Sequence, residues 1–434
     1  MAVVSSKLSV YSKEKSSVFI LTLVWPIVGL ILSLSNWRKP WAKNIFWLFC
    51  TFMGAIFIYS PYGSMLGEGA DGGRYVLDLY SFVRNNTSLS DIFGDFLKTQ
   101  TTMDLYKPLV TLFVSKVFAN GHFLFFVYAS IFGFFYSRNI WYVLERLPQQ
   151  FDRRYYLIIA ILFLLCPIWY INGVRMYTAV HVFIYGLLPC LVENNKSKLI
   201  WVALAPMFHF SFFYVSIIAL VFCFLPLKWK SENSSIFFVL YILYIISLLM
   251  QSLDVQVLAG YLHAYSPEVY EERIDIYTSD TSIERMNAVT NVNWYVSLSG
   301  QIVQWTTSLF MILLYPAVVN KYTKYHFIRG FFMWCLIFGI ISNIMASVPS
   351  GGRFLTIAYM FIVALCLFVV TDTKVNVFYI NYGRIISILY IVPIVFYIRI
   401  GFDYVGYPLI IGNFFTLPFF EGDVPLIEFI KGLI

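Results

Sequence analysis

The stretch FLTIAYMFIVALCLFVVT at residues 354–371 decides the fold class, because it contains no charged residue and no proline. An α-helix needs about 20 mostly apolar residues to cross the roughly 30 Å of hydrocarbon in a bilayer. Comparable apolar runs lie at 18–35, 44–60, 123–141, 156–173, 176–192, 199–226, 235–252, 299–319, 331–347 and 384–400. The pattern predicts an all-α, polytopic bundle of transmembrane helices with about 11 spans, within a range of roughly 10 to 14.

The composition excludes several classes of protein. Of the 434 residues, 60% are hydrophobic and only 12% are charged, whereas a soluble globular domain carries about 25% charged residues. This balance excludes an ordinary soluble enzyme, a disordered chain and a nucleic-acid-binding domain. We therefore expect one integral membrane domain over residues 1–434, which contacts membrane lipid and binds no nucleic acid.

Basic residues are concentrated in six short loops, which the positive-inside rule places in the cytoplasm. These loops lie near 36–43, 138–155, 193–198, 228–232, 320–330 and 372–384. The longer loops 61–104 and 253–298 are rich in acids and are placed outside. The alternation then requires that segment 105–118 does not cross, so we expect it to lie in the interface or to re-enter. The N-terminal tail falls outside, against the charge rule.

Two arginines adjoin apolar runs that should be buried in the membrane. Arg175 lies between the runs 156–173 and 176–192, and Arg353 directly precedes the run 354–371. A charge in such a setting costs about 2.5–3.5 kcal/mol on insertion scales, which makes it a functional candidate. Nearby glycines allow a ligand to approach the backbone, and a guanidinium can bind phosphate through two hydrogen bonds. Alternatively, each arginine snorkels from a helix end to the membrane surface.

His209 lies inside the apolar segment 199–226, shortly after Pro206. The proline and the length of the segment predict a broken helix, which is a common way to build a site inside a membrane. Since imidazole exchanges protons near neutral pH, this histidine could act as a general base. It could equally be a buried hydrogen-bonding group between helices.

Asp71 lies in the first acidic loop, within the sequence GEGADGGRYVLDLY at 67–80. Glycines on both sides make its backbone setting unusually permissive, and from Arg74 onward the aromatic spacing is helical. A carboxylate there is a candidate for chemistry. Alternatively, Asp71 has no chemical role, and these residues form a solvated turn that leads into a surface helix.

The cysteines and histidines show no spacing that is typical of a metal site. The histidines are scattered, and the cysteines lie in or beside apolar runs without a C-x-x-C pair. The cysteines are Cys50, Cys166, Cys190, Cys223, Cys335 and Cys366. We expect them to be small core residues, and we expect no protein-bound metal and no cofactor.

Four short motifs together resemble a known family. They are DGGRY (71–75), NGVRMYTA (172–179), FHFS (208–211) and GGRF (351–354). In this order they resemble the signatures of the EpsG-like branch of the Wzy polysaccharide polymerases, over about residues 40–370. Met176 and Tyr177 stand where that family usually has glutamine and a small residue. The motif at Asp71 also contains an additional pair of glycines.

The resemblance implies a membrane glycosyltransferase of the bacterial inner membrane. It would join oligosaccharide repeat units carried on undecaprenyl diphosphate at the outer face, without a metal or a nucleotide sugar. The product would be a surface polysaccharide, such as O-antigen, capsule or exopolysaccharide. Its partners would be the lipid-linked glycan and, in the same pathway, a flippase and a chain-length regulator.

The resemblance also implies roles for the residues in the motifs. Arg175 and Arg353 would stabilise the negative charge on the diphosphate leaving group. His209 would be the base that takes the proton of the acceptor hydroxyl, with Asp71 as the second choice. The remaining matching residues would bind the diphosphate or the glycan: Arg74, Tyr75, Tyr177 and Ser211.

Two other functions are compatible with the apolar runs. A flippase or transporter of lipid-linked oligosaccharides would be expected to show two similar halves, and the sequence contains no clear internal repeat. A membrane acyltransferase that modifies a glycan would also use a histidine, but its donor usually comes from the cytoplasm. Its base should then lie near the inner face, on the opposite side from the one expected for His209.

Overall fold

The computed structural model describes most of the chain and shows an all-helical protein. The described residues are 14–59, 71–98, 104–225, 234–250, 294–320, 326–347, 350–372, 377–417 and 424–433. Within them the only extended pairings are isolated β-bridges from Phe57 to Val405 and from Gly406 to Pro425. The all-α class is thereby confirmed. The predicted loop 253–298 lies outside the described residues, except for its last few positions, which begin a helix.

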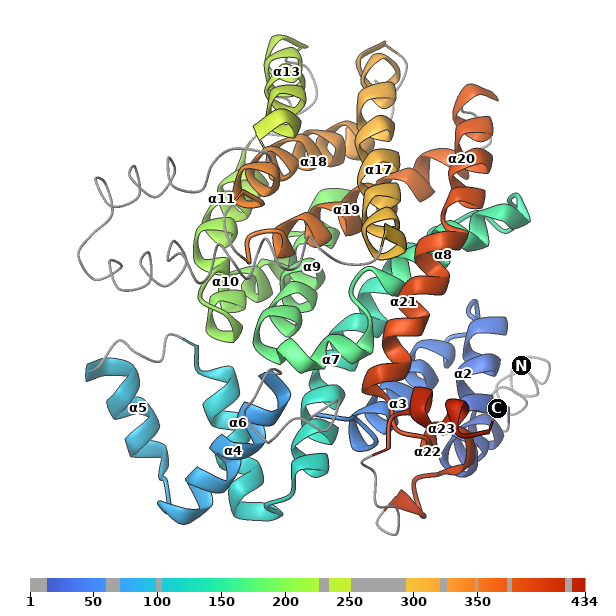
Figure 1. Cartoon of the computed structure of the whole chain (residues 1–434). Coiled ribbons are helices and arrows are strands. Elements are labelled where there is room, and N and C mark those ends of the chain that lie inside the picture. The colour runs from blue at the N-terminus through green and yellow to red at the C-terminus, as the bar shows by residue number, and fades with distance from the viewer. Residues whose placement is uncertain are drawn as a thin grey trace, which may run out of the picture.

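The helices run along the chain as Figure 1 labels them, and residues 14–24 are also helical. In the first half they are α2 (Pro26–Ser35), α3 (Ala42–Ala55), α4 (Asp71–Arg84), α5 (Leu89–Lys98), α6 (Tyr106–Val117), α7 (Gly121–Leu144), α8 (Tyr156–Leu164), α9 (Val174–Glu193), α10 (Leu199–Phe208) and α11 (Phe212–Phe224). In the second half they are α13 (Ser234–Met250), α17 (Trp294–Asn320), α18 (His326–Met345), α19 (Arg353–Val370), α20 (Val377–Leu389), α21 (Ile391–Tyr404), α22 (Pro408–Ile411) and α23 (Leu426–Lys431). Short 3-10 helices η2 (Arg153–Tyr155), η3 (Ile168–Gly173) and η4 (Lys196–Lys198) connect some of them.

The helical segments are long and apolar enough for a membrane protein. Among the described residues, six helical segments have the length and composition to cross a bilayer. They are Gly121–Leu144, Arg153–Glu193, Trp294–Val318, Phe327–Met345, Arg353–Val370 and Phe378–Tyr404, and shorter apolar helices accompany them. The segment Arg153–Glu193 is not one straight helix but contains η2, α8, η3 and α9, and Nε2 of His181 in α9 lies 3.0 Å from the carbonyl oxygen of Cys166, which precedes η3. The polytopic membrane bundle is therefore confirmed.

Segment 199–226 forms a hairpin of two short helices. α10 has 10 residues and α11 has 13, so they are about 15 and 20 Å long, less than the thickness of the hydrocarbon. The two ends of the hairpin meet, because the ammonium of Lys196 lies 4.9 Å from the ring centre of Phe224. The predicted break in the helix is present, and the chain reverses direction there.

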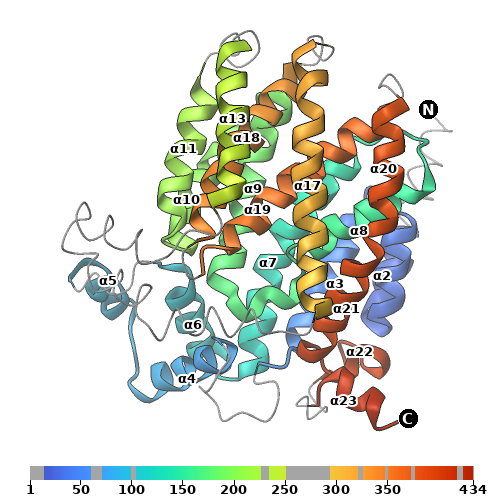
Figure 2. The same cartoon turned by 45° about the horizontal axis from the view of Figure 1, so that its top comes forward.

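α6 is too short to cross a bilayer. This agrees with the prediction that segment 105–118 does not cross, which followed from placing the loops alternately inside and outside. Its 12 residues extend over about 18 Å. It packs against α4 and the start of α7, and Figures 1 and 2 show α4, α5 and α6 gathered at one end of the bundle. In Figure 2 the far ends of α11, α13, α17 and α20 extend to the opposite end.

The core is built from aromatic side chains and from glycines that allow helices to approach closely. Phe183, Trp334 and Phe361 are buried where α9, α18 and α19 meet. α3 and α7 make the closest contact: a Cβ added at Gly133 would lie 2.6 Å from the Cβ of Cys50. Small residues at helix contacts are the usual means of close packing in membranes.

We predict that Gly133→Val lowers the free energy of unfolding in detergent by about 1–3 kcal/mol, because the added carbons must push α3 away from α7. Thermal unfolding of the purified protein measures this effect. Gly94→Ala is the matched control, since a Cβ at Gly94 meets no atom within 4 Å, and its melting temperature should stay the same or rise. A wild-type melting temperature for Gly133→Val would contradict the packing described here.

Candidate functional site

Arg175 is the second residue of α9 and forms an ion pair with a carboxylate far away in the sequence. Its Nη1 donates to Oδ2 of Asp104 over 3.2 Å. The Asp104 side chain is only 9% exposed, whereas the Arg175 side chain is 40% exposed. The Nε of Arg175 is buried and has no hydrogen-bond partner in the described part of the chain. This guanidinium is thus held in place on one side and keeps donors for a further acceptor.

Tyr75 and Asp104 surround the guanidinium in a largely buried setting. The Tyr75 hydroxyl lies close enough to Arg175 to interact with it. Burial raises the pKa of Tyr75 to about 12, so this phenol keeps its proton at neutral pH. Burial also raises the pKa of the Asp104 carboxyl, and the charges of Arg175 and Lys107 act in the opposite direction. Tyr75 comes from α4, so the first acidic loop contributes directly to the surroundings of Arg175.

The glycines after Asp71 allow α4 to begin against the start of α9. Oδ1 of Asn172 accepts a hydrogen bond from the backbone N–H of Gly72 over 3.0 Å. A Cβ at Gly72 would lie 2.9 Å from that same oxygen, so a larger residue would push α4 away. Asp71 itself is paired with Arg74, one turn along α4, and the Arg74 side chain is largely exposed. Asp71 and Arg74 therefore lie at the margin of the site.

His209 occupies the tip of the α10–α11 hairpin. Its Nδ1 lies 2.6 Å from the Ser211 hydroxyl and also accepts the backbone N–H of Ser211 over 3.3 Å. Because a backbone N–H can only donate, Nδ1 is an acceptor in this arrangement, and the proton of the neutral ring belongs on Nε2. The Ser211 hydroxyl also lies 3.7 Å from the sulfur of Met176. The tip therefore lies beside the first turn of α9.

Tyr177 and Arg353 also belong to the surroundings of the first turn of α9. The ring of Tyr177 packs on Tyr170, with 4.6 Å between the ring centres. Arg353 begins α19, and the next residue, Phe354, contacts Phe212 at the hairpin tip with 6.1 Å between the ring centres. The charge of Arg353 acts on the Tyr177 hydroxyl. Within the described residues the half-buried Arg353 forms no ion pair.

These side chains form one group, which we call the α9 cluster. Its members are Tyr75, Asp104, Arg175, Tyr177, His209, Ser211 and Arg353. Four helices begin beside it, at Tyr106, Val174, Phe212 and Arg353. Helix N-termini carry partial positive charge and favour anions. With two guanidiniums and one carboxylate, the cluster is suited to bind a multiply charged anion.

Asp104 and Tyr106 were not among the predicted site residues. The signal for them was the boundary between an acidic loop and segment 105–118, which places an acid directly before an apolar helix. The backbone N–H of Leu105 donates to the carbonyl oxygen of Met207 over 2.9 Å. This bond fixes Asp104 and Tyr106 beside the hairpin tip. Leu105 and Met207 are far apart in the sequence, so the sequence alone does not reveal the contact.

His181 and the six cysteines lie outside the α9 cluster in the described part of the chain. Nε2 of the buried His181 lies 3.0 Å from the carbonyl oxygen of Cys166, and the amide of Asn139 donates to the backbone oxygen of His181 over 2.8 Å. All six cysteines are buried and free. In the described part of the chain, no three His, Cys, Asp or Glu side chains gather closely enough to hold a metal ion.

Comparison with known proteins agrees with the motifs. Searches of curated proteins and of solved structures find no match to this chain. The model of the EpsG family matches residues 46–419, which include every member of the α9 cluster. The resemblance that the four motifs indicated is therefore confirmed, and this chain belongs to the EpsG family.

Proposed function

We propose that this protein polymerises oligosaccharide repeat units carried on a lipid diphosphate, at the outer face of the bacterial inner membrane. Membership of the EpsG family supports a polysaccharide-polymerase role in broad terms. The observation that carries the finer proposal is Arg175, which is fixed by Asp104 and keeps a buried Nε without a partner. A diphosphate oxygen is an acceptor of suitable charge for it.

The reaction needs positive charge where the glycosidic bond breaks. The oxygen of the acceptor hydroxyl bonds to the anomeric carbon, and the bond from that carbon to the diphosphate oxygen breaks. The bonding electrons leave with the lipid diphosphate. Arg175 and Arg353 lie at the start of α9 and α19, so guanidinium charge and helix N-termini act on the same leaving group. Such fixed donors stabilise the developing charge without reorganisation.

The acceptor hydroxyl must lose its proton, and we assign this step to His209. In the arrangement described above, the ring proton of the neutral imidazole is on Nε2. For Nε2 to act as the base, the ring proton must be on Nδ1, where it forms a hydrogen bond to the Ser211 hydroxyl oxygen, 2.6 Å away. The longer hydrogen bond from the backbone N–H of Ser211 to Nδ1 must then open. Ser211 can serve either tautomer because a hydroxyl both donates and accepts. Asp71 remains the second choice, with its carboxylate engaged by Arg74.

The remaining predicted residues would position the glycan and the lipid. The rings of Tyr177 and Tyr170 are tilted by 46° against each other, near the charge of Arg353, and aromatic faces suit sugar rings. Tyr75 keeps its phenol proton and can donate to a phosphate or hydroxyl oxygen. We propose a flippase and a chain-length regulator of the same pathway as the partners that supply the donor and set the polymer length.

We predict that Arg175→Lys and Arg353→Lys each reduce polymerisation by about 10- to 100-fold. Lysine keeps the charge but loses the planar fork, and a hydrogen bond to a charged group contributes about 1.5–3 kcal/mol. The assay supplies the purified protein in detergent with a lipid-linked repeat unit and measures polymer ladders and released lipid diphosphate.

Arg153→Lys is the matched control, because Arg153 is exposed in the loop that follows α7. Wild-type polymerisation by both lysine variants would refute the leaving-group role. A wild-type protein that forms no polymer in detergent, but moves the lipid-linked unit across liposomes, would favour the transporter.

We predict that His209→Gln lowers polymer formed per folded molecule by about 10²–10⁴-fold, the usual contribution of a general base. Ser211→Ala should have a smaller effect of about fivefold, since it removes one hydrogen bond of about 1 kcal/mol. The melting temperature is measured with each rate, so that loss of folded protein is separated from loss of chemistry.

His181→Gln is the control, because this buried histidine lies outside the α9 cluster and bonds to the backbone of Cys166. It should lower the melting temperature and leave the turnover of the folded protein unchanged. Normal turnover per folded His209→Gln molecule would rule out the base assignment.

A further inference from the structure

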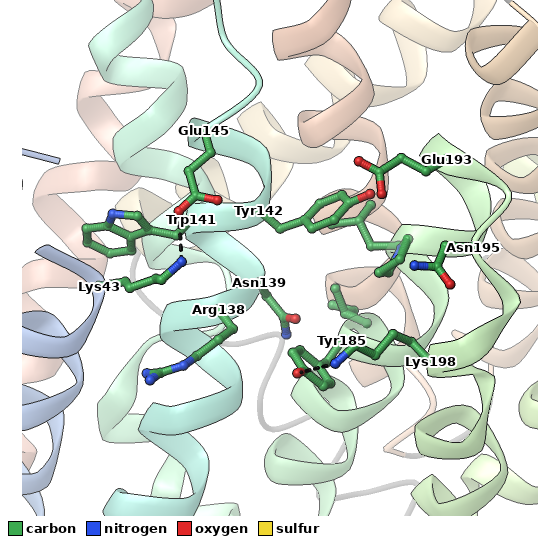
Figure 3. Close-up of a pocket in the computed structure, with 13 residues that line it drawn as sticks. Lys43, Arg138, Asn139, Trp141, Tyr142, Glu145, Tyr185, Glu193, Asn195 and Lys198 are labelled. Carbon is green, nitrogen blue, oxygen red and sulfur yellow. Dashed lines mark hydrogen bonds and ion pairs between the residues drawn. The ribbon is translucent and has the colours of Figure 1, made fainter. Parts of the chain in front are cut away.

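A second polar site lies at the opposite end of α9. A pocket with a volume of about 230 Å³ opens between α7 and α9, and Figure 3 shows side chains that line it from both helices, together with Lys43 of α3 and Lys198 of η4. Drug-sized ligands occupy pockets of roughly 300–1,000 Å³. The pocket is therefore large enough for a small polar group, such as the headgroup of a lipid, but not for a whole lipid.

The carboxylates at the pocket already have cationic partners. Glu145 accepts from Lys43 over 2.9 Å, and Glu193 is paired with Arg146. Arg138 and Lys198 also line the pocket, and neither forms an ion pair with the carboxylates there. These two cations give the pocket its excess of positive charge.

Among the residues that the structure describes, the hydrogen-bond partners of Arg138 and Lys198 are neutral. Arg138 donates to Oδ1 of Asn44 and to the hydroxyl of Ser137, each over 2.7 Å. Lys198 donates to the hydroxyl of Tyr185 over 2.9 Å. A guanidinium has five N–H donors and an ammonium has three. Both groups therefore keep donors for an anion.

Tyr185 links the two cations. Its hydroxyl oxygen accepts from Lys198, so its own proton can be donated to a third group. The charge of Arg138 also acts on this hydroxyl. Figure 3 shows Tyr185 and Lys198 together on one side of the pocket and Arg138 on the other. An anion between them would meet three kinds of donor.

The surroundings of the pocket match a membrane interface. The guanidinium of Arg138 lies 4.3 Å from the ring centre of Phe134 and 5.0 Å from that of Trp47. Trp201 lies beside Tyr185, with 5.9 Å between the ring centres. Tryptophan and tyrosine are enriched at the level of lipid headgroups, and the charge of the loops places this end in the cytoplasm. The cytoplasmic leaflet is rich in anionic lipids.

We propose that this pocket binds the phosphate of an anionic phospholipid of the cytoplasmic leaflet, held by Arg138, Lys198 and Tyr185. The site is distinct from the α9 cluster and does not depend on the polymerase reaction. A lipid bound there would fix α7 against α9 and the start of α10. It would thereby stabilise the bundle on the side remote from the hairpin tip.

The test is native mass spectrometry of the full-length protein with phosphatidylglycerol, combined with its melting temperature. We expect the wild-type protein to retain phosphatidylglycerol in preference to phosphatidylethanolamine and to melt at a higher temperature with it. Lys198→Gln should bind phosphatidylglycerol about fivefold more weakly, which corresponds to about 1 kcal/mol for one basic residue at the surface. Arg138→Lys should bind phosphatidylglycerol with nearly normal affinity, because lysine keeps the positive charge and leaves a hydrogen-bond donor near Asn44.

Arg153→Gln is the matched control, since it removes an exposed charge at the same end but outside the pocket. Equal binding of phosphatidylglycerol by the wild-type protein and Lys198→Gln would overturn the proposal. So would a loss in Arg153→Gln as large as that in Lys198→Gln. A melting temperature raised by inorganic phosphate as much as by phosphatidylglycerol would show a site for free anions and would also overturn it.

Discussion

The ion pair between Arg175 and Asp104 holds together the elements from which the α9 cluster is built. It joins the first turn of α9 to Asp104, two positions before the start of α6, across 71 positions of the chain. Asp104 is the buried partner, so loss of Arg175 would leave its charge uncompensated. The pair therefore holds Arg175 in place, and in the proposed function the carboxylate charge opposes an anionic ligand at the same guanidinium.

The hairpin tip depends on the same clamp. Leu105, the residue after Asp104, donates its backbone N–H to Met207, and the ring of Tyr106 packs on Phe208 with 4.7 Å between the ring centres. The residue after Asp104 and the helix that follows it therefore contact the residues directly before His209. In the proposed function, these contacts connect the arginine that binds the leaving group with the segment that carries the base.

The sequence predicts those features that membrane physics constrains most strongly. Long apolar runs identify α7, α9, α17, α18 and α19, because an uninterrupted apolar run of that length is typical of a membrane-spanning helix. Arg175 and His209 stand out because polar groups in apolar runs are costly. Their roles remain predictions, but the structure places both in one cluster.

The features that escaped prediction are tertiary contacts. Asp104 is one of several acids in its loop, and no local pattern marks it as the partner of Arg175. The apolar segment 199–226 has the composition of one broken span, and only its packing against α9 shows that it is a hairpin. Gly186 permits that packing, because a Cβ there would lie 2.7 Å from the backbone nitrogen of Val202. The acceptor role of Nδ1 in His209 likewise follows from a backbone N–H whose direction the sequence does not reveal.

The most direct test of the account is the affinity of the purified protein for a short-chain polyprenyl diphosphate, measured for Arg175→Ala and Asp104→Asn. If the diphosphate binds the donors of Arg175 that Asp104 leaves free, it lies beside the Asp104 charge, and the two variants must change affinity in opposite directions. Arg175→Ala should bind at least about tenfold more weakly, since it loses charge-assisted hydrogen bonds. Asp104→Asn should bind more tightly, because the competing carboxylate is gone. Equal losses in both variants would contradict the account and show that the ion pair serves only to hold the fold.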